Sequence, residues 1–309
     1  MKKNKKILAI VLVLAIVAGI NQVLLVKVYN QYSLYGSFQA KLERANSLQG
    51  EKIMIIGGSS SNLGIDSRYL QELTGKTVAN LSVSAAVPLR VYIQAAENCA
   101  SAGDVILMPL EYSYYATDFY QIDEAYVDVT AVDGSLKCRD TFLGNVEYCY
   151  TEFLRSFTRL NDCLMFAVKD ALHNENTIYI ADSVNEYGDF VLHENRQPTY
   201  VREKKNVQFR YDQQVVEELN GFIRRMEAKG VRVYLTYPAF DMGSIGNSES
   251  YIQAVMQMME EHFPAEIVLG TPKQFSFDES CFYDTAYHLQ YENRAIYTER
   301  IFACYQMAS

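Results

Sequence analysis

The stretch Lys52-Ile53-Met54-Ile55-Ile56-Gly57-Gly58-Ser59-Ser60-Ser61-Asn62 decides the fold of this chain. It opens with an apolar run that glycine ends, which is typical of a parallel strand buried on both faces. The turn of Gly and Ser that follows leads into a short helix, expected over residues 66–74. Because open α/β sheets bind ligands outside the carboxyl ends of their strands, Ser59 is placed where chemistry could occur.

Strand and helix patterns alternate on both sides of this stretch. The sequence predicts strands at 77–82, 104–110, 231–237 and 265–269, and helices at 88–99, 212–229 and 250–262 with a last helix from about 292. Regular alternation of this kind predicts an α/β domain with a doubly wound, mainly parallel sheet.

Residues 112–205 interrupt the alternation. A helix is expected near 152–172 and a hairpin-like piece around 185–191. A structureless loop of that length is improbable inside a compact domain, so we expect an inserted cap over the sheet. Five aromatic residues near its start suit stacking on sugar rings, and ordinary packing of the cap explains them equally well. They are Tyr112, Tyr114, Tyr115, Phe119 and Tyr120.

The beginning of the chain has the pattern of a membrane anchor. Four lysines lie within residues 1–6, no charged residue occurs from 7 to 20, and the apolar pattern resumes after Asn21 and Gln22. About 20 apolar residues cross a bilayer, and flanking lysines stay in the cytoplasm. We expect a cytoplasmic stub at 1–6, a single transmembrane helix at 7–28, a stalk at 29–50 and an extracytoplasmic domain at 51–309. The cell membrane would be a bacterial-type plasma membrane.

A cleaved signal peptide is the alternative for this segment, because it shares the basic start and the apolar run. The renewed apolar pattern after Gln22 favours an anchor that is retained. Either interpretation exports the domain.

The charge of the chain limits its partners. The formal net charge is −9, and it becomes −13 when the four lysines of residues 1–6 are left out. Nucleic acid is therefore not expected as a partner, because phosphate binding needs a positive surface. Anionic lipid is not favoured either.

Six cysteines, at 99, 138, 149, 163, 281 and 304, show neither a Cys-x-x-Cys pair nor Cys/His zinc spacing. We therefore expect no metal site and no cofactor. A disulfide of Cys138 with Cys149 or Cys163 and free, buried thiols both remain open.

The Gly/Ser-rich turn lacks the residues that define nucleotide-binding loops and the α/β-hydrolase elbow. Neither Gly-x-x-x-x-Gly-Lys nor Gly-x-Gly-x-x-Gly can be written here, and Ser61 replaces the second glycine of a Gly-x-Ser-x-Gly elbow. A nucleophilic serine needs a base, and the histidines are at 173, 193, 262 and 288. His288 stands out because Asp284, four residues before it, can orient its imidazole. Asp278 is a second candidate for that carboxylate.

A serine after the first strand, with Asp and His on one loop near the C-terminus, resembles the SGNH (GDSL-like) hydrolase superfamily. The resemblance covers about residues 50–305. The segments at 64–67 (Gly-Ile-Asp-Ser), 185–189 (Asn-Glu-Tyr-Gly-Asp) and 287–289 (Tyr-His-Leu) are similar to membrane-anchored members from bacterial cell-envelope loci. These include relatives of the D-alanyl-transfer protein of teichoic acid modification and of polysaccharide O-acetylation proteins. The fold implied is the flavodoxin-like SGNH fold.

The resemblance implies a role for each matching residue. Ser59 would be the nucleophile, His288 the general base and later acid, and Asp284 its orienting carboxylate, although the usual Asp-x-x-His is one residue longer here. The chain departs from the superfamily at the oxyanion hole. Ser82 stands where a glycine is expected, and Glu111 where an asparagine is expected.

A carboxylate donates no hydrogen bond unless it is protonated. Asn62 or the backbone N–H groups of residues 59–61 are the alternative oxyanion donors, and Glu111 could instead hold a sugar hydroxyl.

Two functions follow from these residues. The first is an exported serine esterase or O-acyltransferase that acts on cell-envelope polysaccharide; a transferase would also need a multispanning membrane partner to supply its acyl donor. The second is a catalytically inactive protein of the same fold that binds glycan or assists assembly, a reading that Ser82 and Glu111 favour.

Overall fold

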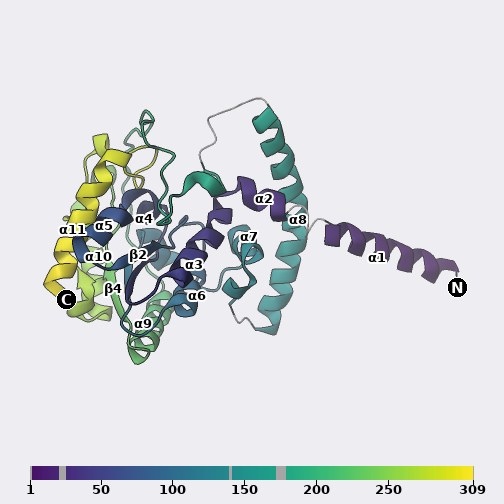
Figure 1. The fold of residues 1–309 in the computed structure, drawn as a ribbon, viewed down its shortest axis with the longest axis horizontal. Helices are drawn as coiled ribbons and strands as arrows, with labels where there is room; N and C mark the ends of the chain where they lie inside the picture. Colours follow the sequence, from purple (N-terminus) through teal and green to yellow (C-terminus); the bar gives the residue numbers. More distant parts are fainter. Residues whose placement is uncertain (1, 21–25, 139–140, 172–178, 309) are drawn as a thin grey trace.

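The computed structural model describes residues 2–20, 26–138, 141–171 and 179–308 (Figure 1). In these residues the domain is built on a five-stranded parallel sheet with the order β2-β1-β3-β4-β5. Its strands are β1 (Lys52–Ile55), β2 (Thr77–Asn80), β3 (Val105–Pro109), β4 (Arg232–Thr236) and β5 (Val268–Leu269). This is a strand order of doubly wound sheets. The predicted α/β class and parallel sheet are confirmed.

The central strands are buried on both faces, as their apolar runs predict. Every residue of β1 and β3 is buried, and Ile53 of β1 pairs with Val105 of β3. The helices that follow the strands cover the sheet. They are α4 (Ser59–Gly64), α5 (Ser67–Thr74), α6 (Leu89–Cys99), α9 (Gln213–Ala228), α10 (Ser248–His262) and α11 (Arg294–Ala308). Among them, α5 packs against both β2 and α11, and α9 packs against β4.

Three helices precede the sheet: α1 (Lys2–Ile20), α2 (Val26–Tyr32) and α3 (Ser37–Ser47). None of the helices in the described part of the chain meets the length and apolarity that crossing a membrane requires. Residues 21–25 of the expected anchor lie outside the described residues. Helix α3, within the expected stalk, buries Phe38, Leu42 and Ala45 in the same core as the sheet.

The described residues of the insertion include the α-helices α7 (Glu124–Val132) and α8 (Phe142–Ala171). The sequence did not predict α7, and α8 begins at Phe142 rather than near residue 152; position 172, the expected end, lies outside the described residues. Val184 and Phe190 form an antiparallel bridge within the expected hairpin-like piece.

Most of the aromatic residues at the start of the insertion serve packing. Tyr112, Tyr114, Tyr115 and Phe119 are buried, and only Tyr120 of this group is largely exposed, at 46%. The Tyr112 ring lies 5.6 Å from that of Phe240. No disulfide joins any of the six cysteines in the described part of the chain.

Candidate functional site

The turn after β1 presents one of its three serine hydroxyls to the site. Ser60 Oγ donates to the carbonyl of Ala239 at 3.1 Å, and Ser61 Oγ donates to the carbonyl of Pro109 at 3.1 Å. Both side chains are fully buried, whereas Ser59, the first residue of α4, is partly exposed. Ser59 is therefore the hydroxyl of this turn that a substrate can reach.

Glu111, which follows β3, lies directly against this turn. Its Oε1 accepts a hydrogen bond from Ser59 Oγ at 3.1 Å and another from the Ser60 N–H at 2.8 Å. The approach needs a glycine at position 58, because a Cβ there would lie 2.4 Å from Glu111 Oε1. Gly58, the residue directly before Ser59, thus makes room for a carboxyl group.

The environment of Glu111 favours its neutral form more than water does. Its side chain is 4% exposed, and burial raises its pKa above the ordinary value for glutamate. The hydrogen bonds from Ser60 and Ser59 and the nearby charge of His288 oppose that rise without cancelling it. A neutral carboxyl keeps one oxygen as an acceptor and gains an O–H that can donate.

His288 and Asp284 form the second half of the site, on the loop between β5 and α11. His288 Nδ1 lies 2.7 Å from Asp284 Oδ1. Tyr179, in the insertion, donates its hydroxyl to Asp284 Oδ2 at 2.5 Å. With the proton on Nδ1 directed at Asp284, Nε2 keeps the lone pair that a general base needs.

Asp284 has a lowered pKa. Burial alone would raise the pKa, but the hydrogen bonds and charge of His288, together with the hydrogen bond from Tyr179, outweigh that effect. Asp284 is therefore ionised at neutral pH. Asp278, the alternative carboxylate, is exposed just before a 3-10 turn (Glu279–Cys281), so Asp284 is the residue at the imidazole.

The two halves share an electrostatic environment without sharing a hydrogen bond. The charge of His288 acts on the carboxyl of Glu111. Within the described residues, however, Ser59 Oγ donates to Glu111, and His288 Nδ1 contacts Asp284 and Tyr179. In free enzymes the bond between nucleophile and base is often long and tightens only when substrate binds.

The other two oxyanion candidates lie behind the turn. The Ser82 N–H donates to Asn80 Oδ1 at 3.0 Å, and the Ser82 hydroxyl is buried with no hydrogen-bond partner among the described residues. Asn62 is fully buried, donates to the carbonyl of Val83 at 3.0 Å and accepts from Lys41. The side chain of Asn62 thus points into the interior, and the hydrogen bond of the Ser59 hydroxyl goes to Glu111.

A buried lysine, Lys41, binds the segments that pack against the Ser59 turn. Lys41 of α3 is 1% exposed, and its Nζ donates to Asn62 Oδ1 at 3.0 Å, to the carbonyl of Ser82 at 2.6 Å and to the carbonyl of Gly188. Burial lowers the pKa of Lys41 to about 7. Gly188 has φ +92°, and a Cβ there would lie 2.3 Å from the carbonyl oxygen of Asn80. Nothing in the sequence of residues 29–50 indicated this lysine.

Asp189 is a second buried charged residue that holds the segments around the Ser59 turn together. It accepts from the Ser67 hydroxyl at 2.6 Å and from Asn80 Nδ2 at 2.9 Å, and it pairs with Arg294 of α11 at 2.9 Å. The segments 64–67 and 185–189, on which the resemblance rested, thus meet under the candidate site. Their order in the sequence was the only signal of this contact.

The other described histidines, His193 and His262, pack against aromatic residues. His193 is 2% exposed among the rings of Phe190, Tyr283 and Tyr291. Its two ring nitrogens have no hydrogen-bond partner in the described residues, and burial lowers its pKa to about 3. His262 contacts the hydroxyl of Tyr211 at 3.0 Å, and residue 173 lies outside the described residues.

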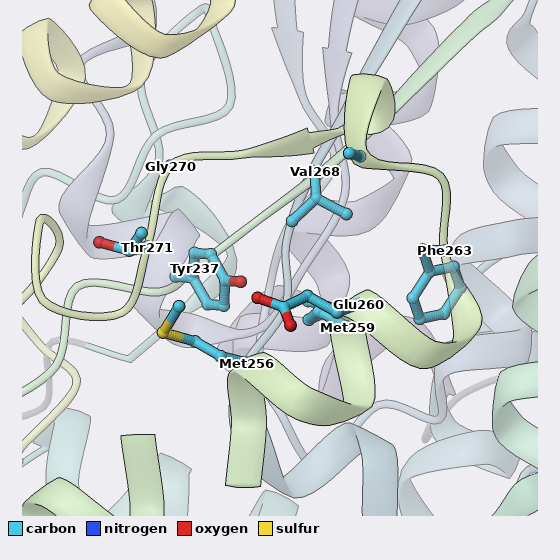
Figure 2. A pocket seen from close by; sticks show the side chains of 9 residues that line it. Tyr237, Met256, Met259, Glu260, Phe263, Val268, Gly270 and Thr271 are labelled. Carbon is cyan, nitrogen blue, oxygen red and sulfur yellow. The ribbon is translucent and has the colours of Figure 1, made fainter. Parts of the chain in front are cut away.

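A separate cavity of about 260 Å³ lies where β4 and β5 end, beside α10 (Figure 2). Apolar side chains line most of it, and its polar side-chain groups are the Glu260 carboxylate and the hydroxyls of Tyr237 and Thr271. Ser59, Glu111 and His288 are not among its lining residues. Over the described ranges, no three His, Cys, Asp or Glu side chains gather in a way that could hold a metal ion.

Comparison with known proteins gives no match, whether with protein-family models, with curated proteins or with solved structures. Function is therefore argued from the geometry of the site.

Proposed function

We propose that this chain is a serine-dependent esterase or O-acyltransferase of the SGNH (GDSL-like) type. It would be anchored in a bacterial-type plasma membrane through residues 7–28 and act outside the cell on envelope polysaccharide. The observation that carries the proposal is the Asp284–His288 pair, whose Oδ1 and Nδ1 atoms lie 2.7 Å apart, together with the partly exposed Ser59 hydroxyl that donates to Glu111. The strand order β2-β1-β3-β4-β5 supports it.

The reaction begins when Ser59 Oγ turns from Glu111 to His288. Nε2 of His288 accepts the hydroxyl proton while Oγ attacks the acyl carbonyl. The tetrahedral intermediate collapses to an acyl-serine, and His288 returns the proton to the departing alcohol or other leaving group. Water or a sugar hydroxyl then loses a proton to His288 and attacks the acyl-serine, which restores Ser59 and releases the acid or the new ester.

Glu111 supplies the oxyanion donor in this proposal. Both of its hydrogen bonds are accepted by Oε1, so a proton on Oε2 would leave the Ser59 and Ser60 contacts intact. The O–H would then face the oxygen that becomes negative, as a buried neutral carboxylic acid can. Glu111 would thus act where the resemblance leads one to expect asparagine.

A fluorophosphonate probe tests the activated serine in the full-length protein. We expect the probe on Ser59, and we expect Ser59→Ala and His288→Ala to abolish labelling. Ser60→Ala is the matched control, because its hydroxyl is buried against the carbonyl of Ala239 and plays no part in the reaction. Absence of label in protein with a cooperative unfolding transition would contradict the proposal.

One observation favours the second candidate function, a non-catalytic protein that binds glycan or assists assembly. In the structure the Ser59 hydroxyl is donated to a carboxyl oxygen and not to the imidazole. Envelope-glycan binding that survives in Ser59→Ala, together with no turnover of acylated glycan by the wild type, would support this candidate.

A further inference from the structure

Helix α8 directs two arginines, Arg155 and Arg159, toward the domain. Arg159 donates from Nε to Asp128 of α7 at 2.7 Å and pairs with Glu152 at 2.6 Å. Arg155 also binds Asp128, at 2.8 Å, and pairs with Asp162 at 2.9 Å. Asp128 is 1% exposed, and Arg155 and Arg159 are 6% and 2% exposed. These ion pairs therefore hold Arg155 and Arg159 against α7, inside the protein.

The opposite side of α8 is apolar and exposed. Ten large apolar side chains between Phe142 and Val168 are each 47% to 81% exposed. They recur at spacings of three and four residues, as at 143, 146, 150, 153 and 157, so they share one face of the helix. At 1.5 Å per residue this face is about 40 Å long. Glu147, at its edge, is exposed as well.

This arrangement reverses the usual polarity of a surface helix. A helix that faces water presents charged residues outward and apolar residues to the core. A soluble monomer scatters single apolar side chains over its surface, and a large continuous patch marks an interaction site. The outer face of α8 is therefore built to contact an apolar medium.

The neighbours of α8 indicate which medium this is. The ring of Phe166 on α8 stacks on Tyr32 of α2 at 5.8 Å, and Tyr29 of α2 donates to Asp128 at 2.9 Å. Helix α2 is the first described element after the apolar segment that begins in α1. Figure 1 shows α1 extending from the end of the molecule that α8 covers, with α11 at the opposite end.

We infer that the apolar face of α8 lies on a lipid bilayer, parallel to its plane, as a second membrane contact beside the N-terminal segment. The inference rests on the membrane attachment in the proposed function, but on none of its catalytic residues. A bilayer matches a long face of aliphatic and aromatic side chains, because acyl chains require no complementary hydrogen bonds. The ion pairs to Asp128 hold the other side of α8 against the domain, so the helix lies along the membrane and does not cross it.

Intrinsic fluorescence tests this placement, because the chain contains no tryptophan. Phe153→Trp places a single reporter on the face, where Phe153 is 50% exposed. Ile296→Trp is the matched control, since Ile296 is 44% exposed and belongs to α11, the helix at the opposite end of the molecule from α8 (Figure 1). Each full-length variant is reconstituted into phosphatidylcholine vesicles with and without brominated acyl chains.

We expect F153W emission to be blue-shifted, at least about twofold quenched by brominated lipid and shielded from acrylamide, because an interfacial helix buries its apolar face among acyl chains. The I296W variant should show none of these effects. Adding Phe157→Lys to F153W should reduce the quenching while the unfolding transition is kept, because Phe157 is 51% exposed.

Two results would overturn the inference. One is equal quenching of F153W and I296W by brominated lipid in vesicles that both variants have joined. The other is cross-linking between copies through this face with F153W emission insensitive to bromination, which would assign the face to a second copy. Fluorophosphonate labelling of the same samples reports the catalytic proposal separately.

Discussion

The two carboxyl groups of the candidate site differ in what surrounds them. Glu111 is 4% exposed, accepts from Ser59 and Ser60 through one oxygen, and has a raised pKa. Asp284 is more open, receives Tyr179 on one oxygen and His288 on the other, and has a lowered pKa. Burial dominates in the first case, and hydrogen bonds to the charged form dominate in the second.

This difference teaches how one site can hold an acid and a base at the same pH. Titratable pairs whose environments move their pKa values apart divide the acid and base roles between them. Here Glu111 is suited to donate as a neutral acid, and ionised Asp284 is suited to stabilise an imidazolium.

Removing the base should have the largest consequence. We expect His288→Ala to lower turnover of acylated glycan by about 10²- to 10⁴-fold, the usual contribution of a general base. Single-turnover kinetics with a chromogenic ester measures it. His262→Ala is the control, because the His262 imidazole binds the Tyr211 hydroxyl and lies outside the candidate site. An equal loss in this variant would show that the base has been assigned to the wrong residue.

Substitutions at Glu111 come next. Glu111→Ala removes the donor and should cost about 10²- to 10³-fold in kcat, the usual cost of losing one oxyanion donor. Glu111→Gln keeps both an acceptor and a donor and should retain activity within about tenfold. If Glu111→Gln is as inactive as Glu111→Ala, then Glu111 acts as a base and not as a donor.

The pH profile of Glu111→Gln sharpens the same comparison. Because the folded-state pKa of Glu111 is raised, its neutral form is present below that pKa and is lost as pH rises through it. The wild type should therefore lose activity and some stability on the alkaline side, and Glu111→Gln should lose less of both. Activity and urea unfolding over a pH series measure the two effects.

The hydroxyl of Tyr179 should contribute a smaller amount. Tyr179→Phe removes a donor to Asp284, and we expect kcat to fall by about 3- to 10-fold because a hydrogen bond to a charged group is lost. Tyr200→Phe is matched to it, because the Tyr200 hydroxyl donates to a different buried carboxylate, that of Asp241, at 2.9 Å. A decrease in kcat of the same size in both variants would indicate a general loss of stability.

The smallest expected effect on catalysis is at His193, which lies near the base half without contacting substrate. Its pKa falls from an ordinary 6.5 to about 3 in the folded state, so the unfolded chain binds the additional proton. Stability is then lost as pH falls below 6.5, by about 1.4 kcal/mol per pH unit. His193→Phe should flatten that decline in urea unfolding while kcat at pH 7 stays unchanged. An unaltered acid slope would show that His193 is not the responsible group.

The sheet was predictable because its signal is local. Residues 52–56 and 105–110 are nearly continuous apolar runs, and a strand buried on both faces needs nothing else to be recognised. Helix α8 was misplaced at its start because Phe142, Leu143 and Val146 point away from the core. Its buried side carries Arg155 and Arg159, so an interpretation that assigns apolar residues to the core misjudges this helix.

The candidate site was predictable only in part. Ser59 and His288 follow from their places after a strand and beside an aspartate, which are properties of short segments. The contact between Ser59 and Glu111 joins residues 52 positions apart, and that between Tyr179 and Asp284 joins residues 105 positions apart. Contacts of this kind depend on the order of the strands in the sheet. That order cannot be deduced from any single segment of the sequence.

The support beneath the Ser59 turn also determines when the site can form. Lys41 meets Gly188 across 147 positions, and Arg294 meets the carbonyl of Ile65 across 229 positions. Contacts between such distant residues form late in folding, because the long loops between them must close first. A growing chain would therefore carry an unassembled and inert site until α11 has been synthesised and has docked, so activity would begin only with the complete domain.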